Sequence, residues 1–509
     1  MGIARVYSRA ILGMDSPRVV IEVHVSSGLP SLAIVGLPEA SVKESRERVR
    51  SALLNSGFSM PAKRITVNLA PADLPKTGGR YDLAIAMGIL LATNQMPCQL
   101  QGELEFYGEL ALTGELRPVA GLLPSLLQLP PGIHAFIPWG NFAEMQLYQQ
   151  TQSAQPLALA ENLRQVCAYL LEQPPQNLPQ IPALEVLPPS YSLCLSDIHG
   201  QAQAKRVLEI CASGGHSLLM VGEPGAGKSM LASRLVTLLP PLSQQQALEN
   251  ASLRSLAGQD LDFSTFYQRP FVNPHHSASA AAVIGGGKIP KPGALSLANH
   301  GVLFLDELPE FNRDVLESLR EPLESGRVEI ARVQQQVSYP AQVQLIAACN
   351  PSPSGYFPDD PLGRCKDTPT QISRYLKKLS GPLLDRIDCH LEVPAVEIRA
   401  LQAAKLDGET SAQVRKRVEQ VQQLQLERQG VLNSVLTNRQ LASLVSIDAA
   451  SEQLVNQSLQ RFGLSARSYY RILRLALTIA DMQQARRVES VHLAEALSYR
   501  LSSKLAELF

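Results

Sequence analysis

Gly222-Glu223-Pro224-Gly225-Ala226-Gly227-Lys228-Ser229 stands between the apolar run Leu218–Val221 and a segment with helical spacing, Met230–Val236. It matches the pattern G-x-x-x-x-G-K-[ST] in full, between a predicted strand and a predicted helix. In that context the backbone N–H groups of a glycine-rich loop surround a polyphosphate at the positive end of a helix. We therefore predict that all eight residues bind a nucleotide, with Lys228 at the β- and γ-phosphates and Ser229 on Mg²⁺.

A second motif follows downstream, where the apolar run Val302–Leu305 ends in Asp306 and Glu307. Four apolar residues indicate a buried parallel strand, and ligand sites in open α/β sheets lie at the carboxyl ends of such strands. Asp306 is expected to complete the Mg²⁺ shell and Glu307 to polarise the attacking water. The alternative is a strand that ends in a solvated acidic turn, which the upstream loop disfavours.

Composition limits the class of protein. The chain has 509 residues, 46 basic and 46 acidic, so its formal charge is zero. At about 150 residues per domain the length suggests roughly three domains, and any nucleic-acid contact must come from a local patch. The seven cysteines form no C-x-x-C pair, which suits a reducing cytoplasm, and the longest apolar run, Leu83–Ala92, is too short for a membrane span.

Proline-rich sequence divides the chain. Residues 172–190 carry six prolines, which is typical of a stiff linker. A second break near Val393–Ala395 precedes a Gln-rich stretch that we expect to be helical from about 396 to 428 and onward to the end. The predicted domains are 1–172, a linker at 173–190, 191–395 and 396–509.

Hydrophobic periodicity predicts a mixture of strands and helices in the first domain. The expected strands are Arg18–Val25, Ser31–Val35, Ile65–Leu69 and Glu105–Thr113, and the expected helices are Ser41–Ser56 and Tyr81–Ala92.

Two further residues are candidates for the nucleotide site. Asn350 follows the apolar run Val343–Cys349, and an amide at a strand end can orient a water and sense the γ-phosphate; the alternative is an Asn that starts a turn before Pro351. Arg386 lies between Asp385 and Asp388 and can neutralise charge on a transferred phosphoryl group, often in a neighbouring subunit. The alternative is a surface salt bridge.

In order and spacing these motifs resemble those of the AAA+ ATPases. Residues 270–279, Gly285–Gly287 and 291–301 narrow the resemblance to the magnesium-chelatase-like group and, within it, the ComM-type branch-migration helicases. The resemblance implies an α/β fold: an AAA+ core with a parallel sheet flanked by helices, an N-terminal α+β domain similar to the Lon protease domain, and a C-terminal helical lid.

The resemblance also assigns roles. Lys228 and Ser229 match Walker A, Asp306 and Glu307 match Walker B, Asn350 matches sensor 1, Arg386 matches the arginine finger, and Arg467 matches sensor 2, which touches the γ-phosphate from the lid.

Segments 270–290 and 328–340 match insertions that project toward a ring pore in this family. The second is expected to form a hairpin with its tip at Ala331–Gln335. Lys288 and Arg332 are the candidates for DNA phosphate contacts, although a solvated loop lysine is an equal reading of Lys288. We predict no metal at His275-His276, because adjacent histidines point apart on most backbones.

Two departures from the family pattern bear on function. Of the cysteines that many relatives carry just after the sensor 1 Asn-Pro, only Cys365 is present, with Cys349 just before that motif, so we expect no structural zinc. Arg80 and Leu123 stand where the Lon protease has its serine and lysine, so proteolysis should be absent. A basic edge formed by Lys63, Arg64, Lys76 and Arg80 would instead bind DNA or a partner.

The resemblance implies an ATP-dependent DNA motor in the cytoplasm, which forms a hexameric ring and moves branched junctions during natural transformation. Its expected cofactors are ATP and Mg²⁺, and its expected partners are single-stranded and branched DNA, further copies of itself and recombination proteins. The rival functions are the ATPase subunit of a magnesium chelatase, an ATP-dependent Lon-like protease, and a scaffold that loads other proteins onto DNA.

Overall fold

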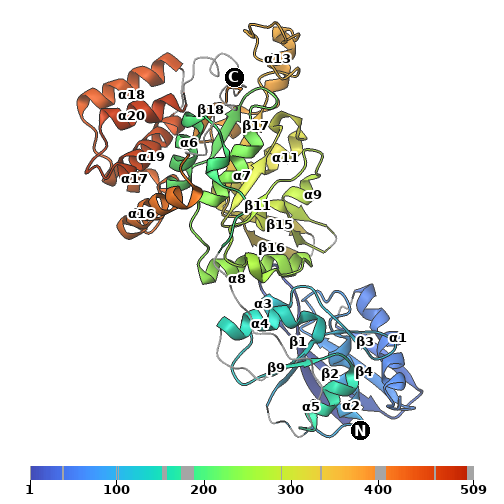
Figure 1. The fold of residues 1–509 in the computed structure, drawn as a ribbon. Coiled ribbons are helices and arrows are strands. Elements are labelled where there is room, and N and C mark those ends of the chain that lie inside the picture. The colour runs from blue at the N-terminus through green and yellow to red at the C-terminus, as the bar shows by residue number, and fades with distance from the viewer. Residues whose placement is uncertain are drawn as a thin grey trace.

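The computed structural model describes residues 2–36, 39–98, 100, 102–151, 157–172, 189–287, 289–332, 335–395, 408–462 and 466–500. An N-terminal α+β part lies at one end of a core built on a parallel sheet, and a group of C-terminal helices packs beside that core (Figure 1). The predicted linker at 173–190 falls almost entirely outside the described residues.

The N-terminal part is a mixed seven-stranded sheet in the order β3-β4-β2-β1-β5-β8-β9. In β2 every second residue is buried, as the alternation predicts, with Val19, Ile21, Val23 and Val25 on the inner face. The strands are β1 (Gly2–Arg9), β2 (Arg18–Ser26), β3 (Ser31–Val35), β4 (Arg64–Ala70), β5 (Leu104–Phe106), β8 (His134–Pro138) and β9 (Leu157–Ala160). The helices are α1 (Ala40–Asn55), α2 (Asp82–Ala92), α3 (Leu122–Leu127), α4 (Phe142–Thr151) and α5 (Leu163–Leu170).

The single strand expected over residues 105–113 is wrong. β5 ends at Phe106, and a separate short strand, β6 (Glu109–Leu110), pairs with β7 (Leu116–Arg117). Between them Gly108 has a φ of 151°, and its N–H donates to the Arg80 carbonyl at 3.2 Å. Glycine permits this conformation, so the chain leaves the main sheet at that residue.

The core sheet has five parallel strands in the order β11-β14-β17-β10-β18. The central runs are buried on both faces, as a parallel sheet covered by helices requires. The strands are β10 (Leu218–Val221), β11 (Phe271–Val272), β14 (Val302–Leu305), β17 (Gln344–Cys349) and β18 (Cys389–Glu392), and the first helices are α6 (Ala202–Gly214), α7 (Lys228–Leu238) and α8 (Gln244–Ala257).

Short elements are inserted around this sheet. The predicted hairpin is confirmed as β15 (Arg327–Arg332) paired with β16 (Gln335–Pro340), but the pairing continues to Arg332 and Gln335, so the tip is shorter than expected. The remaining elements are α9 (Ala280–Val283), β12 (Gly285–Gly286), β13 (Lys291–Pro292), α10 (Ala294–Leu297), α11 (Arg313–Ser318), α12 (Arg320–Ser325), α13 (Pro369–Leu376) and α14 (Gly381–Leu384), with 3-10 turns η1 (Trp139–Asn141), η2 (Leu195–Asp197), η3 (Phe263–Thr265), η4 (Leu308–Glu310) and η5 (Asn433–Val435).

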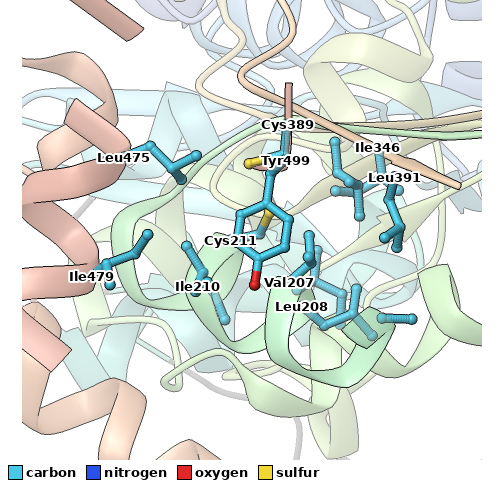
Figure 2. Packing of buried hydrophobic residues seen from close by; sticks show 14 of the residues in the cluster. Val207, Leu208, Ile210, Cys211, Ile346, Cys389, Leu391, Leu475, Ile479 and Tyr499 are labelled. Atoms are coloured by element: carbon cyan, nitrogen blue, oxygen red, sulfur yellow. The ribbon is translucent and has the colours of Figure 1, made fainter. Parts of the chain in front are cut away.

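The C-terminal helices form the predicted helical lid. They are α16 (Ser411–Gln429), α17 (Asn438–Leu444), α18 (Ala449–Phe462), α19 (Ala466–Met482) and α20 (Ser490–Ser498). Figure 2 shows Leu475 and Ile479 of α19 and Tyr499 packed against Cys211 of α6 and Cys389 of β18. Lid and core therefore share one hydrophobic cluster on this side of the sheet.

Within the described residues, the helical stretch predicted from about 396 to 428 contains α16, and the prediction for residues 396–407 is not tested. α16 starts at Ser411. The Thr410 hydroxyl accepts from the Gln413 N–H, and the Gln413 side-chain oxygen accepts from the Thr410 N–H. This reciprocal cap sets the start of the helix, and residues 396–407 lie outside the described part of the chain.

The N-terminal part also packs on the core, through α8. The Gly121 N–H donates to the Ser255 carbonyl at 2.9 Å, and the Ser255 hydroxyl donates to the buried Glu144 carboxylate at 2.9 Å. Ala251 and Phe266 join the apolar cluster of the N-terminal part. The two parts therefore share buried surface. Within the described residues, no helix combines the length and apolarity needed to cross a bilayer.

Candidate nucleotide site

The phosphate loop connects strand β10 of the core sheet to α7, as predicted. Gly225 and Gly227 have φ values of 77° and 91°, which glycine adopts without strain, and no atom lies within 4 Å of the position where a Cβ would stand on either residue. At Gly222 a Cβ would come within 2.4 Å of the Val393 carbonyl oxygen, so that position needs glycine for close packing. The space beside these two glycines is thus free of neighbouring atoms, while the start of the loop is packed on Val393, the residue after β18.

Lys228 points back across the loop. Its Nζ donates to the Gly222 carbonyl at 2.6 Å, to the Glu223 carbonyl at 3.0 Å and to Asn350 Oδ1 at 3.0 Å. The residue is 8% exposed, and burial lowers the pKa of its ammonium group because loss of water penalises the charged form. Phosphate oxygens in the loop would favour the charged form, so the lysine is suited to a polyanionic ligand.

The two residues expected to hold Mg²⁺ are in contact. The Ser229 hydroxyl donates to Asp306 Oδ2 at 2.7 Å, and Asp306 Oδ1 accepts the Glu307 N–H at 3.0 Å. A hydroxyl and a carboxylate are hard oxygen ligands, and Mg²⁺ prefers one or two such protein ligands together with waters and substrate phosphates. Ser229 and Asp306 fit that requirement.

Glu307 occupies an unusual backbone conformation beside a histidine. Its φ is 52°, which is uncommon for a residue with a side chain and is often found at functional sites. Its Oε2 lies 3.1 Å from His276 Nδ1, and the two side chains are 53% and 35% exposed. The carboxylate is therefore held, within reach of solvent, by a residue from the end of β11.

The expectation that the paired histidines point apart is wrong. The rings of His275 and His276 pack on one another with centroids 4.2 Å apart. The turn that follows β11 brings both rings to one side, where His276 meets Glu307. No group of three or more His, Cys, Asp or Glu side chains suited to a metal occurs in the described residues.

The segment that follows Asn350 covers the phosphate loop. Arg364 Nη2 lies 2.9 Å and 3.1 Å from the two carboxylate oxygens of Glu223, and its guanidinium stands 4.2 Å from the Tyr356 ring centre. A Cβ on Gly355 would come within 2.7 Å of Pro224. In the same segment, Cys365 lies near the hydroxyls of Ser352 and Ser354.

Arg386 and Arg467 meet at one acidic residue. Glu324 Oε1, on α12, lies 2.7 Å from Arg386 Nη2 and 3.6 Å from Arg467 Nη2. Arg386 is held further by the Pro382 carbonyl and does not pair with the acids on either side of it in sequence. Within the described residues neither guanidinium forms a hydrogen bond or ion pair with the phosphate loop.

The lid is joined to the core next to Arg386. Asp388 is 6% exposed and pairs with Arg471 of α19, and it accepts bonds from the Ser217 N–H and hydroxyl, each at 3.0 Å. Burial opposes ionisation, but the charge of Arg471 and these bonds hold the pKa of Asp388 well below its usual range. Arg471 also donates to the Arg386 carbonyl at 2.8 Å, which couples the position of this arginine to the lid.

The remaining predicted residues are less fully placed. Lys288 lies outside the described residues, and Arg332 is the last residue of β15, with its backbone opposite Gln335. The basic edge predicted on the N-terminal part is wrong for Lys76 and Arg80, which are 0% and 5% exposed, whereas Lys63 and Arg64 are exposed and their role stays a prediction. Lys76 donates to the Gly36 carbonyl and Arg80 to the Ser125 hydroxyl. Leu123 is also buried.

Sequence reasoning missed His276 as a partner of Glu307 and Arg364 as a partner of Glu223. His276 follows closely on a strand of the core sheet, which is a usable signal. Arg364 lies more than one hundred residues from Glu223 in sequence, and nothing local indicates the pair.

Comparison with known proteins gives matches along most of the chain. Residues 194–401 match the family described as magnesium chelatase, subunit ChlI; residues 21–137 match subunit ChlI of Mg-chelatase; and residues 408–500 match its C-terminal region. The competence protein ComM of Haemophilus influenzae is 47% identical over 515 residues, covering 100% of this chain and 99% of that protein. The uncharacterized protein YifB of Escherichia coli is 45% identical over 511 residues, covering 99% and 98%. The uncharacterized protein Rv2897c of Mycobacterium tuberculosis is 38% identical over 512 residues, covering 98% and 99%.

Proposed function

Because the chain belongs to the magnesium-chelatase-like AAA+ ATPase family that includes ComM and YifB, we propose that it is a ring-forming DNA motor that drives branch migration during natural transformation. Family membership implies ATP hydrolysis with Mg²⁺. The DNA substrate, the ring and the cytoplasmic location belong to the proposal.

One observation carries the enzymatic part of this proposal: the ends of three neighbouring strands bring together the groups that ATP hydrolysis needs. Lys228 reaches Asn350 at 3.0 Å and Ser229 reaches Asp306 at 2.7 Å. Bound Mg²⁺ would neutralise charge on the phosphates, and Ser229 and Asp306 are placed to hold it. Glu307 would orient and polarise the attacking water once its contact with His276 opens.

The ring is supported by the position of the two arginines. Arg386 and Arg467 share Glu324 rather than contacting the phosphate loop of their own chain. In a hexamer a neighbour's γ-phosphate would compete with Glu324 for both guanidinium groups. Hydrolysis in one subunit would then depend on an arginine from the next.

The DNA task is supported by similarity to ComM and by the hairpin β15–β16. Arg332 lies at the end of that hairpin, and Lys288 belongs to the neighbouring insertion. One or two cations per subunit, repeated around a ring, would line a channel with charge although the whole chain is neutral. The partners would be single-stranded and branched DNA and recombination proteins.

A chelatase ATPase is the second candidate, because all three matched families are described by a magnesium chelatase subunit. The N-terminal domain does not separate this chain from such subunits, because residues 21–137 themselves match one of those descriptions. A Lon-type protease is disfavoured, because the buried Arg80 and Leu123 cannot act as a serine and lysine pair.

The test is migration of a synthetic three- or four-stranded DNA junction with ATP, comparing the wild type with Glu307→Gln. Movement by the wild type alone supports the proposal. ATP hydrolysis that is indifferent to DNA and produces no movement overturns it. Metal insertion into a porphyrin in the presence of a porphyrin-binding subunit would then establish the chelatase function.

A further inference from the structure

An open groove of about 910 Å³ lies between α13 and the segment that follows the catalytic strand β14. We call it the basic groove. Its lining residues are Glu310, Phe311, Asn312, Arg313, Pro369, Thr370, Ser373, Arg374, Lys377 and Lys378. In Figure 1, α13 projects from the core away from the N-terminal part, so this wall of the groove stands clear of the main sheet.

The groove has a strong charge imbalance. Four cations line it against one carboxylate, Glu310, whose Oε2 lies 3.6 Å from Lys378 Nζ. Arg313, Arg374 and Lys377 are exposed, and none of them forms an ion pair with any residue that the structure describes. In a chain with equal numbers of acidic and basic residues, this concentration of unpaired positive charge is local.

Helix α13 presents its cations from a fixed support. Ile372, Tyr375 and Leu376 are buried and form a small cluster with Cys365. Arg374 stands between Ile372 and Tyr375 in the sequence, Lys377 follows Leu376, and both of these basic residues are exposed. Because one face of the helix is anchored, the charged side chains on the other face have a defined position. Binding of a partner therefore costs less conformational entropy.

We propose that the basic groove binds the phosphate backbone of nucleic acid, as a contact separate from the hairpin β15–β16. The proposal rests on the proposed DNA motor and adds a second DNA site to it. The groove offers cations together with the hydroxyls of Thr370 and Ser373 and the amide of Asn312, which are the donors typical of phosphate contacts. Its aromatic residue, Phe311, is 3% exposed, so the groove lacks the exposed aromatic anchor usual for a peptide partner.

The groove adjoins the catalytic groups. Its wall Glu310–Arg313 begins three residues after Glu307, and η4 connects them. Behind the opposite wall, the buried Tyr375 of α13 interacts with the backbone of Asn350. Nucleic acid bound in the groove would therefore contact both segments that carry the Walker B and sensor 1 residues, and we expect it to alter the rate of ATP turnover.

The experiment compares Arg374→Gln/Lys377→Gln with Lys416→Gln/Arg439→Gln, a control that removes two exposed cations from lid helices. Binding of a fluorescein-labelled 30-nucleotide single strand is measured by anisotropy over a range of salt, with a non-hydrolysable ATP analogue. Each single-strand phosphate contact contributes about 0.7 to the slope of log affinity against log salt. Loss of two contacts should lower the slope by about 1.4, which is roughly 25-fold weaker binding at about 0.1 M salt. Basal ATPase activity and the thermal melting curve should match the control, while stimulation by DNA should fall.

The outcomes separate this proposal from the one on which it rests. If the wild type binds the strand and the groove variant has the affinity and salt slope of the control variant, the groove is not a DNA site and the DNA motor stands. If the wild type binds no DNA, both proposals fail. If a poly-glutamate chain binds the groove and DNA does not displace it, the groove is a site for acidic protein and the present proposal is overturned.

Discussion

Replacing His276 with alanine tests whether this histidine restrains the catalytic carboxylate. The Nδ1–Oε2 contact with Glu307 is 3.1 Å long, but both side chains are partly exposed, so its contribution is about 1 kcal/mol at most. One kcal/mol corresponds to a ratio of about five to one between restrained and free Glu307. Loss of the contact would raise the free fraction from about one sixth to about one half. Basal ATPase activity should therefore rise about threefold in His276→Ala, and stimulation by DNA should shrink by the same factor.

The assay is steady-state phosphate release with and without single-stranded DNA. His275→Ala is the matched control, because it removes the neighbouring ring and leaves the contact with Glu307 in place. The double variant His276→Ala/Glu307→Gln should be inactive, which shows that the added turnover passes through the same carboxylate. A basal rate in His276→Ala that equals the wild type, or that falls, would refute the idea of restraint.

Three other changes probe the site and its support. Arg471→Met leaves the buried Asp388 without its cation and should lower the free energy of unfolding by about 3 kcal/mol or more, as measured by urea denaturation. If Asp388→Asn in the same chain restores stability, the ion pair is responsible for the loss. An unchanged denaturation midpoint in Arg471→Met would contradict the assignment. Because the folded-state pKa of Asp388 lies below its ordinary value of 3.8, this stability should be present above about pH 4 and be lost as the pH falls further, in an acid titration followed by circular dichroism. Lys228→Ala should abolish binding of a fluorescent ATP analogue, and retained binding would remove the lysine from the site. Arg386→Ala should stop ATP hydrolysis and leave nucleotide binding nearly intact. Glu324→Ala frees the same arginine, so its hydrolysis rate should equal or exceed that of the wild type. If Arg386→Ala hydrolyses ATP at the wild-type rate, another arginine is the arginine finger.

The parts of the site that follow from local rules were predictable. A glycine-rich loop between a strand and a helix has few available conformations, so the role of Gly222–Ser229 as a phosphate loop follows from the residues themselves. The apolar runs that became β10, β14 and β17 are also local signals, and β14 and β17 are each followed by a polar residue of the site, Asp306 and Asn350. The start of α16 at Ser411 depends on the Thr410 cap, which hydrophobic periodicity does not register.

Errors arose where a side chain's surroundings decided its role. Lys76 and Arg80 are charged and lie in a polar stretch, which suggested a basic edge, but packing buries both. The contact of His276 with Glu307 and that of Arg364 with Glu223 join segments that are distant in the chain. Burial of a side chain and its pairing with a distant residue depend on how all elements pack. A local sequence pattern therefore predicts neither of them.

By itself the sequence determined the local chemistry of this protein: a phosphate loop, an acidic strand end, an amide at another strand end and candidate arginines. Only the tertiary structure decided which of these groups meet. Ser229 and Asp306 are 77 residues apart and Lys228 and Asn350 are 122 apart, and they come together because β10, β14 and β17 lie side by side in a parallel sheet. Hydrogen bonds between strands join backbones of any sequence, so they do not determine which strands become neighbours. The order of the strands is instead set by the burial of side chains as the whole core packs. The same packing placed Arg386 and Arg467 on Glu324 and gathered the cations of the basic groove.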